Sequence, residues 1–209
     1  MKIDPAEHSE ADTYKLLTNL VVPRPIAWVT SVAATGVVNL APYSFFNALS
    51  SDPPYVAVSV GTRADGTPKD TAANILSSGE FVVNMVTEEL LGAMNVSAAD
   101  FPPDQSEASA ANLALSASLR VQVPRLTAAQ VSLECRLFRS VELGSNTLVI
   151  GEIVMFHVAD QLLGSRMHIK DFAPIGRLGS PSVYCRTTDR FEAPRISYAD
   201  WLRGRRDAG

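Results

Sequence analysis

The sequence runs Ile26-Ala27-Trp28-Val29-Thr30-Ser31-Val32-Ala33, then Ala34-Thr35-Gly36, then Val37-Val38-Asn39-Leu40-Ala41. Glycine provides the backbone geometry of a tight turn, and apolar, β-rich runs on both sides of such a turn predict a β-hairpin. We expect the wider stretch from Pro23 to Asn84, which contains this hairpin, to carry the function of the chain.

Further strands and short helices are predicted after the hairpin. They are strands at Pro54 to Val60 and Phe81 to Val86, a helix at Asp70 to Ser78 that ends before Gly79, a second short helix at Thr87 to Asn95, and a loop with a helical turn at Pro102 to Asn112.

The segment from Val131 to Leu143 alternates apolar and polar residues, as a strand with one buried face does. Only Phe138 and Arg139 break this period of two. Gly144-Ser145-Asn146 then predicts a turn into a strand from Thr147 to Ala159, which completes a second hairpin.

The order of these elements indicates the fold class. Strands that come in hairpins, with helices inserted singly, favour a mainly β (α+β) antiparallel barrel over a doubly wound sheet. A chain of 209 residues fits one domain, which we assign to residues 1–190. The charged tail at 191–209 contains Arg203-Gly204-Arg205-Arg206 and is interpreted as a surface arm or a frayed terminus.

The composition excludes some partners and favours another. A net charge of −4 provides no basic face for nucleic acid or anionic lipid. Residues 1–14 lack the basic and apolar regions of a signal peptide, and the apolar run from Thr147 to Val158 is short and contains Glu152, so we expect a cytoplasmic protein without a membrane span. A hydrophobic share of 46% and a mean hydropathy of +0.09 indicate a buried subunit interface.

The cysteines and histidines give little support for a metal centre. Cys135 and Cys185 have no partner at metal-binding spacing, and both are interpreted as buried free thiols. His8, His157 and His168 show no ligand pairing either.

An anion site is predicted where the helix at 70–78 begins. The common glycine-rich nucleotide motifs are absent from the sequence. A helix start still offers unpaired backbone amides and a favourable dipole to a phosphate. The side chains of Arg63, Lys69, Thr71 and Asn74 lie around this start and suit a phosphomonoester. The alternative is that Asp70 is an ordinary N-cap and that both cations are solvated.

A second candidate cluster surrounds Pro42, where we expect a strand to end. Proline cannot donate to a strand ladder, so the sheet edge is left open there. Asn39, Ser44, Thr30 and Ser31 lie nearby and could hydrogen-bond a flat heterocycle between apolar neighbours. A solvated barrel rim would have a similar sequence.

Several segments, in order, resemble the flavin reductase-like FMN-binding split barrels. They are Pro23-Arg24-Pro25-Ile26-Ala27-Trp28-Val29-Thr30-Ser31, Gly36, Asn39-Leu40-Ala41-Pro42-Tyr43-Ser44-Phe45, Asp52-Pro53-Pro54, Lys69-Asp70-Thr71-Ala72-Ala73-Asn74-Ile75 and Glu80-Phe81-Val82-Val83-Asn84. A weaker likeness continues through Gly151-Glu152 to His157 and through Arg177-Leu178-Gly179, to about Tyr184.

This resemblance implies a homodimeric, antiparallel Greek-key split β-barrel that holds flavin mononucleotide (FMN) near the dimer interface. Its phosphate would lie at the segment with Arg63, Lys69 and Thr71. The ribityl chain and the ring would face a second set of residues, partly through backbone groups. That set is Thr30, Ser31, Asn39, Ala41, Pro42 and Ser44.

Similar proteins commonly oxidise a nicotinamide, so NADH or NADPH is the expected co-substrate. Bound flavin performs the electron chemistry, and the protein orients it. His157 is the side-chain candidate for assisting catalysis or touching the nicotinamide, with a structural histidine as the alternative. Arg177, with Gly179, is expected to close the site, although a surface arginine would fit the same pattern.

Three functions remain open at this point. The first is an NAD(P)H-dependent flavin reductase that hands reduced flavin to a separate monooxygenase. The second is a flavoredoxin-like FMN electron carrier without nicotinamide activity. The third is a barrel that serves only as an interaction module, although the intact Lys69-Asp70-Thr71 segment argues against it.

Overall fold

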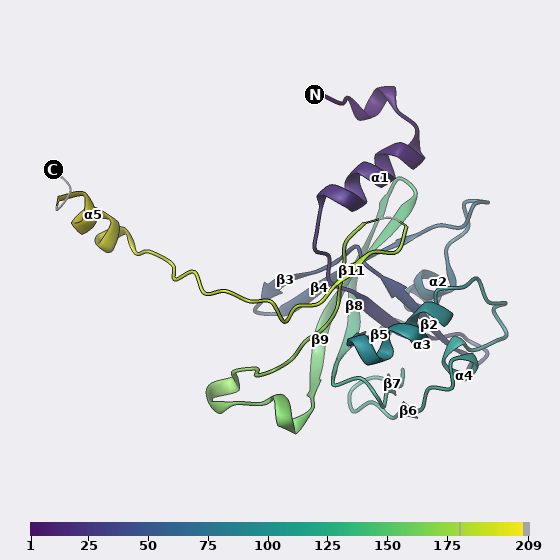
Figure 1. Cartoon of the computed structure of the whole chain (residues 1–209). Coiled ribbons are helices and arrows are strands. Elements are labelled where there is room, and N and C mark those ends of the chain that lie inside the picture. Colours follow the sequence, from purple (N-terminus) through teal and green to yellow (C-terminus); the bar gives the residue numbers. More distant parts are fainter. Residues whose placement is uncertain (180, 207–209) are drawn as a thin grey trace.

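The computed structural model describes residues 1–179 and 181–206 (Figure 1). In this part of the chain the main sheet has seven strands in the order β2-β1-β5-β8-β9-β4-β3, and every pairing is antiparallel. Its strands are β1 (Ala27–Val32), β2 (Val38–Tyr43), β3 (Phe46–Ser51), β4 (Pro54–Gly61), β5 (Glu80–Met85), β8 (Val131–Leu143) and β9 (Asn146–Val158).

The remaining elements are short. The two-residue strands are β6 (Leu115–Ser116) with β7 (Arg125–Leu126), and β10 (Gly176–Arg177) with β11 (Tyr184–Cys185). The α-helices are α1 (Glu10–Leu20), α2 (Asp70–Ser78), α3 (Leu91–Val96), α4 (Glu107–Ala110) and α5 (Tyr198–Arg206). Single 3₁₀ turns lie at Pro5–Glu7, Glu88–Leu90, Asp160–Leu162 and Ser165–Met167.

The two edges of the sheet, β2 and β3, are joined by the short connection Ser44-Phe45. The amide of Ser59 in β4 donates to the Phe45 carbonyl at 2.8 Å, which ties this connection to the opposite end of the sheet. The sheet is therefore a barrel that is split between its edge strands. The predicted mainly β, antiparallel split-barrel fold is confirmed.

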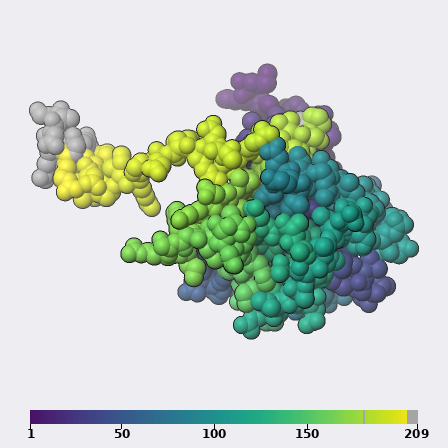
Figure 2. All heavy atoms as spheres, turned by 60° about the horizontal axis from the view of Figure 1, so that its bottom comes forward, coloured from purple at the N-terminus to yellow at the C-terminus, as the bar shows by residue number. Residues whose placement is uncertain are grey.

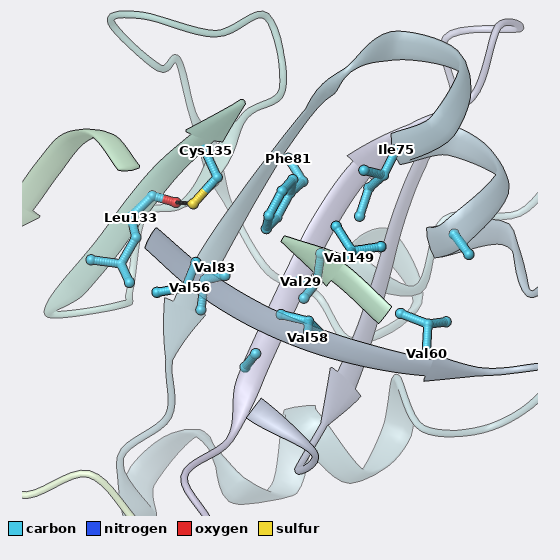
Figure 3. Close-up of a cluster of buried hydrophobic side chains, with 12 residues drawn as sticks. Val29, Val56, Val58, Val60, Ile75, Phe81, Val83, Leu133, Cys135 and Val149 are labelled. Carbon is cyan, nitrogen blue, oxygen red and sulfur yellow. Dashed lines mark hydrogen bonds between the residues drawn. The ribbon is translucent and has the colours of Figure 1, made fainter. Parts of the chain in front are cut away.

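The barrel interior is filled by aliphatic side chains around the ring of Phe81 (Figure 3). They come from every long strand except the two edge strands, and Ile75 of α2 closes one end. The labelled members are Val29, Val56, Val58, Val60, Val83, Leu133, Cys135 and Val149. This packing fixes the strand registers, because a slip of one residue would turn the apolar side chains outward.

A second core lies on the other face of the β1–β2 hairpin. Trp28 and Leu40 are fully buried there against Met94 of α3 and Leu126 of β7. The indole Nε1 of Trp28 donates to the Ser97 hydroxyl at 2.8 Å, so the polar atom of this large ring is satisfied. The hairpin is thus packed on both faces, which makes it a rigid support for its neighbours.

One sequence prediction near the sheet edge was wrong. β2 does not end before Pro42 but continues to Tyr43, with Pro42 opposite Trp28. Proline is tolerated there because β2 is an edge strand, so the missing amide removes no bond that a further strand would accept. β3 and α1 were not predicted from the sequence. Cys185 is only half-buried, whereas Cys135 is buried as expected.

A C-terminal arm follows the barrel (Figures 1 and 2). Every residue from 188 to 203 is exposed, and α5 lies at the far end of this arm. Residues 207–209 of the predicted tail lie outside the described residues. Among the described helices, none is long and apolar enough to cross a membrane.

Candidate functional site

A pocket of about 1070 Å³ lies beside the split in the barrel. Its wall is built from the connection between β2 and β3, the end of β4 with the loop that leads to α2, one side of α1, and the segment around β10 and β11. Of the residues predicted from the sequence, six line it: Pro42, Ser44, Arg63, Lys69, Arg177 and Gly179.

The described wall of the pocket is strongly cationic. Arg24, Arg63, Lys69 and Arg177 all line it, whereas Glu10 is the single carboxylate among the described lining residues. Aromatic side chains of Tyr43, Phe45 and Tyr184 supply flat faces on the same wall. Positive charge beside aromatic surface suits a ligand that is both flat and anionic.

The start of α2 has the features of an anion site. Lys69 is the N-cap residue, and no side chain caps this end of the helix. The first-turn amides therefore lack the acceptor that serine or aspartate usually gives. The alternative in which Asp70 is the N-cap was wrong, because its carboxylate instead accepts a hydrogen bond from Nη2 of Arg63 at 2.6 Å. Half-buried Lys69 has no ion pair with any described residue.

Four other predicted residues form a buried polar network beneath this helix start. Thr71 accepts hydrogen bonds from Asn39 Nδ2 at 2.8 Å and from Tyr43 Oη at 2.9 Å. Ser31 accepts from Asn74 Nδ2 at 3.2 Å and, more weakly, from Asn39 Nδ2. These bonds hold the first turns of α2 against the β1–β2 hairpin, so the four residues support the pocket without lining it. Burial raises the pKa of Tyr43 to about 12, which keeps its hydroxyl a donor.

Thr30, Ala41 and His157 also lie away from the pocket wall. The Thr30 hydroxyl is fully buried and donates to the Pro124 carbonyl at 2.7 Å. Ala41 is half-buried opposite Val29 in the hairpin. His157 Nε2 lies 2.5 Å from Oε1 of Glu134, on the part of the sheet that residues 119–121 cover.

Sequence reasoning missed Arg24 as a site residue. It is 6% exposed and contributes to the pocket wall, and its Nε donates to the Ser44 hydroxyl at 3.3 Å. Its backbone forms a two-way bridge with Arg177. The available signal was an arginine between two prolines directly before a buried strand, a position where an ordinary surface arginine is not expected.

The chain matches a known protein family and several solved structures. The model of the flavin reductase like domain matches residues 19–191. Nitrilotriacetate monooxygenase component B from Bacillus cereus superposes with a TM-score of 0.88 at 40% identity, over 92% of this chain and 98% of that one. The 2-nitrobenzoate 2-nitroreductase NbaA from Pseudomonas fluorescens gives 0.86 at 36% identity, over 95% and 98%.

A protein from Deinococcus radiodurans is 46% identical over 196 residues, which is 90% of this chain and 86% of that protein. The family match covers the hairpin, α2 and the segment around Arg177, and so includes every described part of the pocket wall except the three α1 residues Glu10, Tyr14 and Thr18. The chain belongs to the flavin reductase-like family.

Proposed function

We propose that the pocket binds FMN and that the chain is an NAD(P)H-dependent flavin reductase. The observation that carries this proposal is the uncapped start of α2, with Lys69 as its N-cap residue and Arg63 beside it. A phosphate would accept from the free first-turn amides and neutralise the unpaired ammonium group. The residues present therefore fit the phosphate end of a flavin nucleotide.

The remainder of the wall fits the rest of the cofactor. Tyr43 and Phe45 offer apolar surface, and the Ser44 hydroxyl and backbone groups of the same connection offer hydrogen bonds. Bound FMN would supply the electron transfer between a nicotinamide and an acceptor. The chain itself would orient both molecules and keep water from the reacting faces. The assignments of Ser31, Asn39, Thr71 and Asn74 are proposed as indirect, through the hydrogen bonds by which they support the wall. Those of Thr30 and Ala41 are proposed as indirect too, as parts of the β1–β2 hairpin that carries Pro42.

The likeness to a monooxygenase component B supports a function in which reduced flavin is passed to a separate monooxygenase. NADH or NADPH is the proposed electron donor. A cytoplasmic location fits a reaction that uses either nucleotide.

We also propose that the chain acts as a homodimer. Leu20 and Val21 at the end of α1 and Leu49 in β3 are exposed, at 75%, 56% and 53%. The arm adds Phe191 at 91% and Ile196 at 72%. Apolar surface on this scale is typical of a protein that buries it against a partner.

The test is the absorption spectrum of the purified protein, followed by anaerobic mixing with NADH and with NADPH. We expect a yellow protein, or retention of added FMN, and bleaching of the flavin on mixing. Flavin that binds but stays oxidised would assign the chain to the electron carriers. A colourless chain that fails to bind added FMN would refute the cofactor proposal.

A further inference from the structure

Arg24 carries a buried positive charge for which the described residues provide no carboxylate. Its Nη1 donates to the carbonyls of Thr18 and Val21, and Nε donates to the Ser44 hydroxyl. Its Nη2 has no acceptor among the described residues. A buried guanidinium that contacts only neutral groups is electrostatically uncompensated, and an anion is the partner that would stabilise it most.

Arg177 lies directly opposite Arg24. The Arg24 amide donates to the Arg177 carbonyl at 2.9 Å and the Arg177 amide donates back at 2.8 Å. Residues in such a hydrogen-bonded antiparallel pair project their side chains to the same side, and both side chains do line the pocket.

The Arg177 guanidinium is held in place by neutral partners. Its Nη1 donates to the Tyr184 hydroxyl at 2.6 Å and its Nη2 to the Pro181 carbonyl at 2.8 Å. Its Cζ lies 4.7 Å from the centroid of the Tyr184 ring. Like Arg24, it forms no ion pair with a described carboxylate. The two arginines are thus a fixed pair of positive charges.

This pair and the cations at α2 lie on different segments of the chain. Burial lowers the pKa of Arg24, an interaction with Tyr14 opposes this, and the positive charge of Arg177 lowers the pKa further. Arg63, in contrast, is already partnered by Asp70. The pocket therefore has two distinct cationic places, one at the helix start and one at the Arg24–Arg177 bridge.

We propose that Arg24 and Arg177 form a second anion subsite, which binds the anionic group of the molecule that exchanges electrons with the flavin. The ligand chemistry is a phosphate or carboxylate oxyanion, supplied either by the pyrophosphate of a nicotinamide dinucleotide or by the carboxylate of an aromatic acid. This inference rests on the proposed function, because it assigns the phosphate of FMN to the other cationic place.

A purely structural role for Arg24 is the competing explanation. Its bonds to the Thr18 and Val21 carbonyls cap the C-terminal end of α1. That role accounts for Nη1 but not for Nη2, nor for the unpaired Arg177 beside it. Because an Arg24 substitution can loosen α1, Arg177→Ala is the primary variant.

The first test compares charged and neutral reductants. In Arg177→Ala we expect the KM for NADH to rise about tenfold or more, as the loss of one charge-assisted contact predicts, with little change in kcat. The neutral donor 1-benzyl-1,4-dihydronicotinamide should react at an unchanged rate. Arg186→Ala is the matched control, because Arg186 lies nearby in sequence but pairs with Glu88 on the surface.

A second arm tests a carboxylate source. Protein whose bound FMN has been reduced photochemically is mixed with 2-nitrobenzoate and, separately, with uncharged nitrobenzene. If Arg177→Ala reacts more slowly with NADH alone, the pyrophosphate is the anion that the subsite binds. If it reacts more slowly with 2-nitrobenzoate alone, the carboxylate is that anion. The proposal would be overturned if the rates for charged and neutral molecules fell equally, or if the rate fell for neither anion.

A measurement of FMN binding distinguishes the failure of this inference from the failure of the proposed function. We expect Arg177→Ala to bind FMN as the unchanged chain does, and a large loss of FMN affinity would show that the pair belongs to the phosphate site instead. Calorimetric titration with inorganic pyrophosphate, at saturating FMN, should show binding that weakens in Arg177→Ala but not in Arg186→Ala. If the chain binds no FMN, the proposed function fails, while a pyrophosphate titration without FMN, compared between Arg177→Ala and Arg186→Ala, still measures the subsite.

Discussion

Gly151 lies in β9 at a point where the ring of Phe81 leaves no room for a side chain. A Cβ at this position would stand 2.4 Å from Cζ of Phe81 and 3.2 Å from Cβ of Cys135. Because both neighbours are fully buried in a close-packed core, neither can move aside without disturbing the packing around it.

We expect Gly151→Ala to lower the free energy of unfolding by about 1–3 kcal/mol through overpacking. Urea unfolding measures this loss. Gly92→Ala is the control, since a Cβ there meets nothing within 4 Å and alanine favours the helix that contains it. Equal stability of the two variants would mean that the barrel interior accommodates the methyl group.

A substitution of Lys69 tests the assignment of the FMN phosphate to the start of α2. Its ammonium lines the pocket at an uncapped helix start, so Lys69→Ala should weaken FMN binding by roughly tenfold or more, as removal of a charged hydrogen bond does. Fluorescence titration with FMN gives the dissociation constant, and Lys2→Ala, at an exposed position away from the pocket wall, is the control. An unchanged constant would remove Lys69 from the site.

Individual site residues were predictable from the sequence to different degrees. Lys69 and Arg63 stood out because cations beside a helix start have a local explanation. Ser31, Asn39 and Asn74 were selected as ligand contacts, but the structure buries them against one another and Thr71. A sequence pattern shows that a polar residue is near a site, but not which buried partner satisfies it.

At the level of elements, the second hairpin was the most predictable part of the fold. β8 spans Val131–Leu143 as expected, and β9 begins one residue before the predicted strand. The break in the period of two at Phe138 has a structural counterpart, since the register with β9 shifts between Leu137 and Arg139. An extra residue in a strand shifts the alternation of the two faces by one position, so the β-bulge can be recognised in the sequence as a break in the period of two.

Glu134 of β8 clamps a neighbouring loop to the sheet. Its fully buried carboxylate accepts from the amides of Leu119, Arg120 and Val121, and also contacts His157 Nε2. Burial alone would raise the pKa of Glu134, but the hydrogen bonds from His157 and the amides outweigh it, so that the pKa lies below its ordinary value of 4.5. The ionised carboxylate is therefore favoured by the folded state.

The sign of the pH dependence follows from this lowered pKa. The stabilisation is fully present above the unfolded pKa near 4.5 and is lost as the pH falls through the lower folded value. We expect Glu134→Gln to be less stable than the unchanged chain at neutral pH, by about 1–3 kcal/mol, and the difference to shrink on acidification. Urea unfolding across this pH range measures it, with exposed Glu142→Gln of the same strand as control. A difference independent of pH would contradict a role for the charge.

At the level of the whole molecule, the pocket joins segments that local patterns cannot bring together. The bridge between Arg24 and Arg177 links the start of the barrel to its C-terminal segment, and α1 adds a further wall. Hairpins follow from local turns, but the sheet order places β8 and β9 between the consecutive strands β4 and β5. Such long-range pairing is decided by which faces bury each other, so the fold class was predictable and the full pocket was not.

The C-terminal arm provides the last prediction, about the proposed dimer. Phe191 and Ile196 are exposed on a segment in which every residue from 188 to 203 is exposed, so the described part of the chain does not bury them. We commit to a second copy as the partner that does, because a homodimer is the assembly already proposed from the other exposed apolar residues. Burial of one such side chain contributes about 1.5–3 kcal/mol.

We expect Phe191→Ser with Ile196→Ser to raise the dissociation constant of the dimer by about tenfold or more. Light scattering across a dilution series measures this constant. Arg195→Ala, at an exposed position of the same arm, should leave it unchanged. A double variant that stays as dimeric as the unchanged chain would show that the interface lies elsewhere, at the exposed ends of α1 and β3, and an unchanged chain that is monomeric would refute the dimer itself.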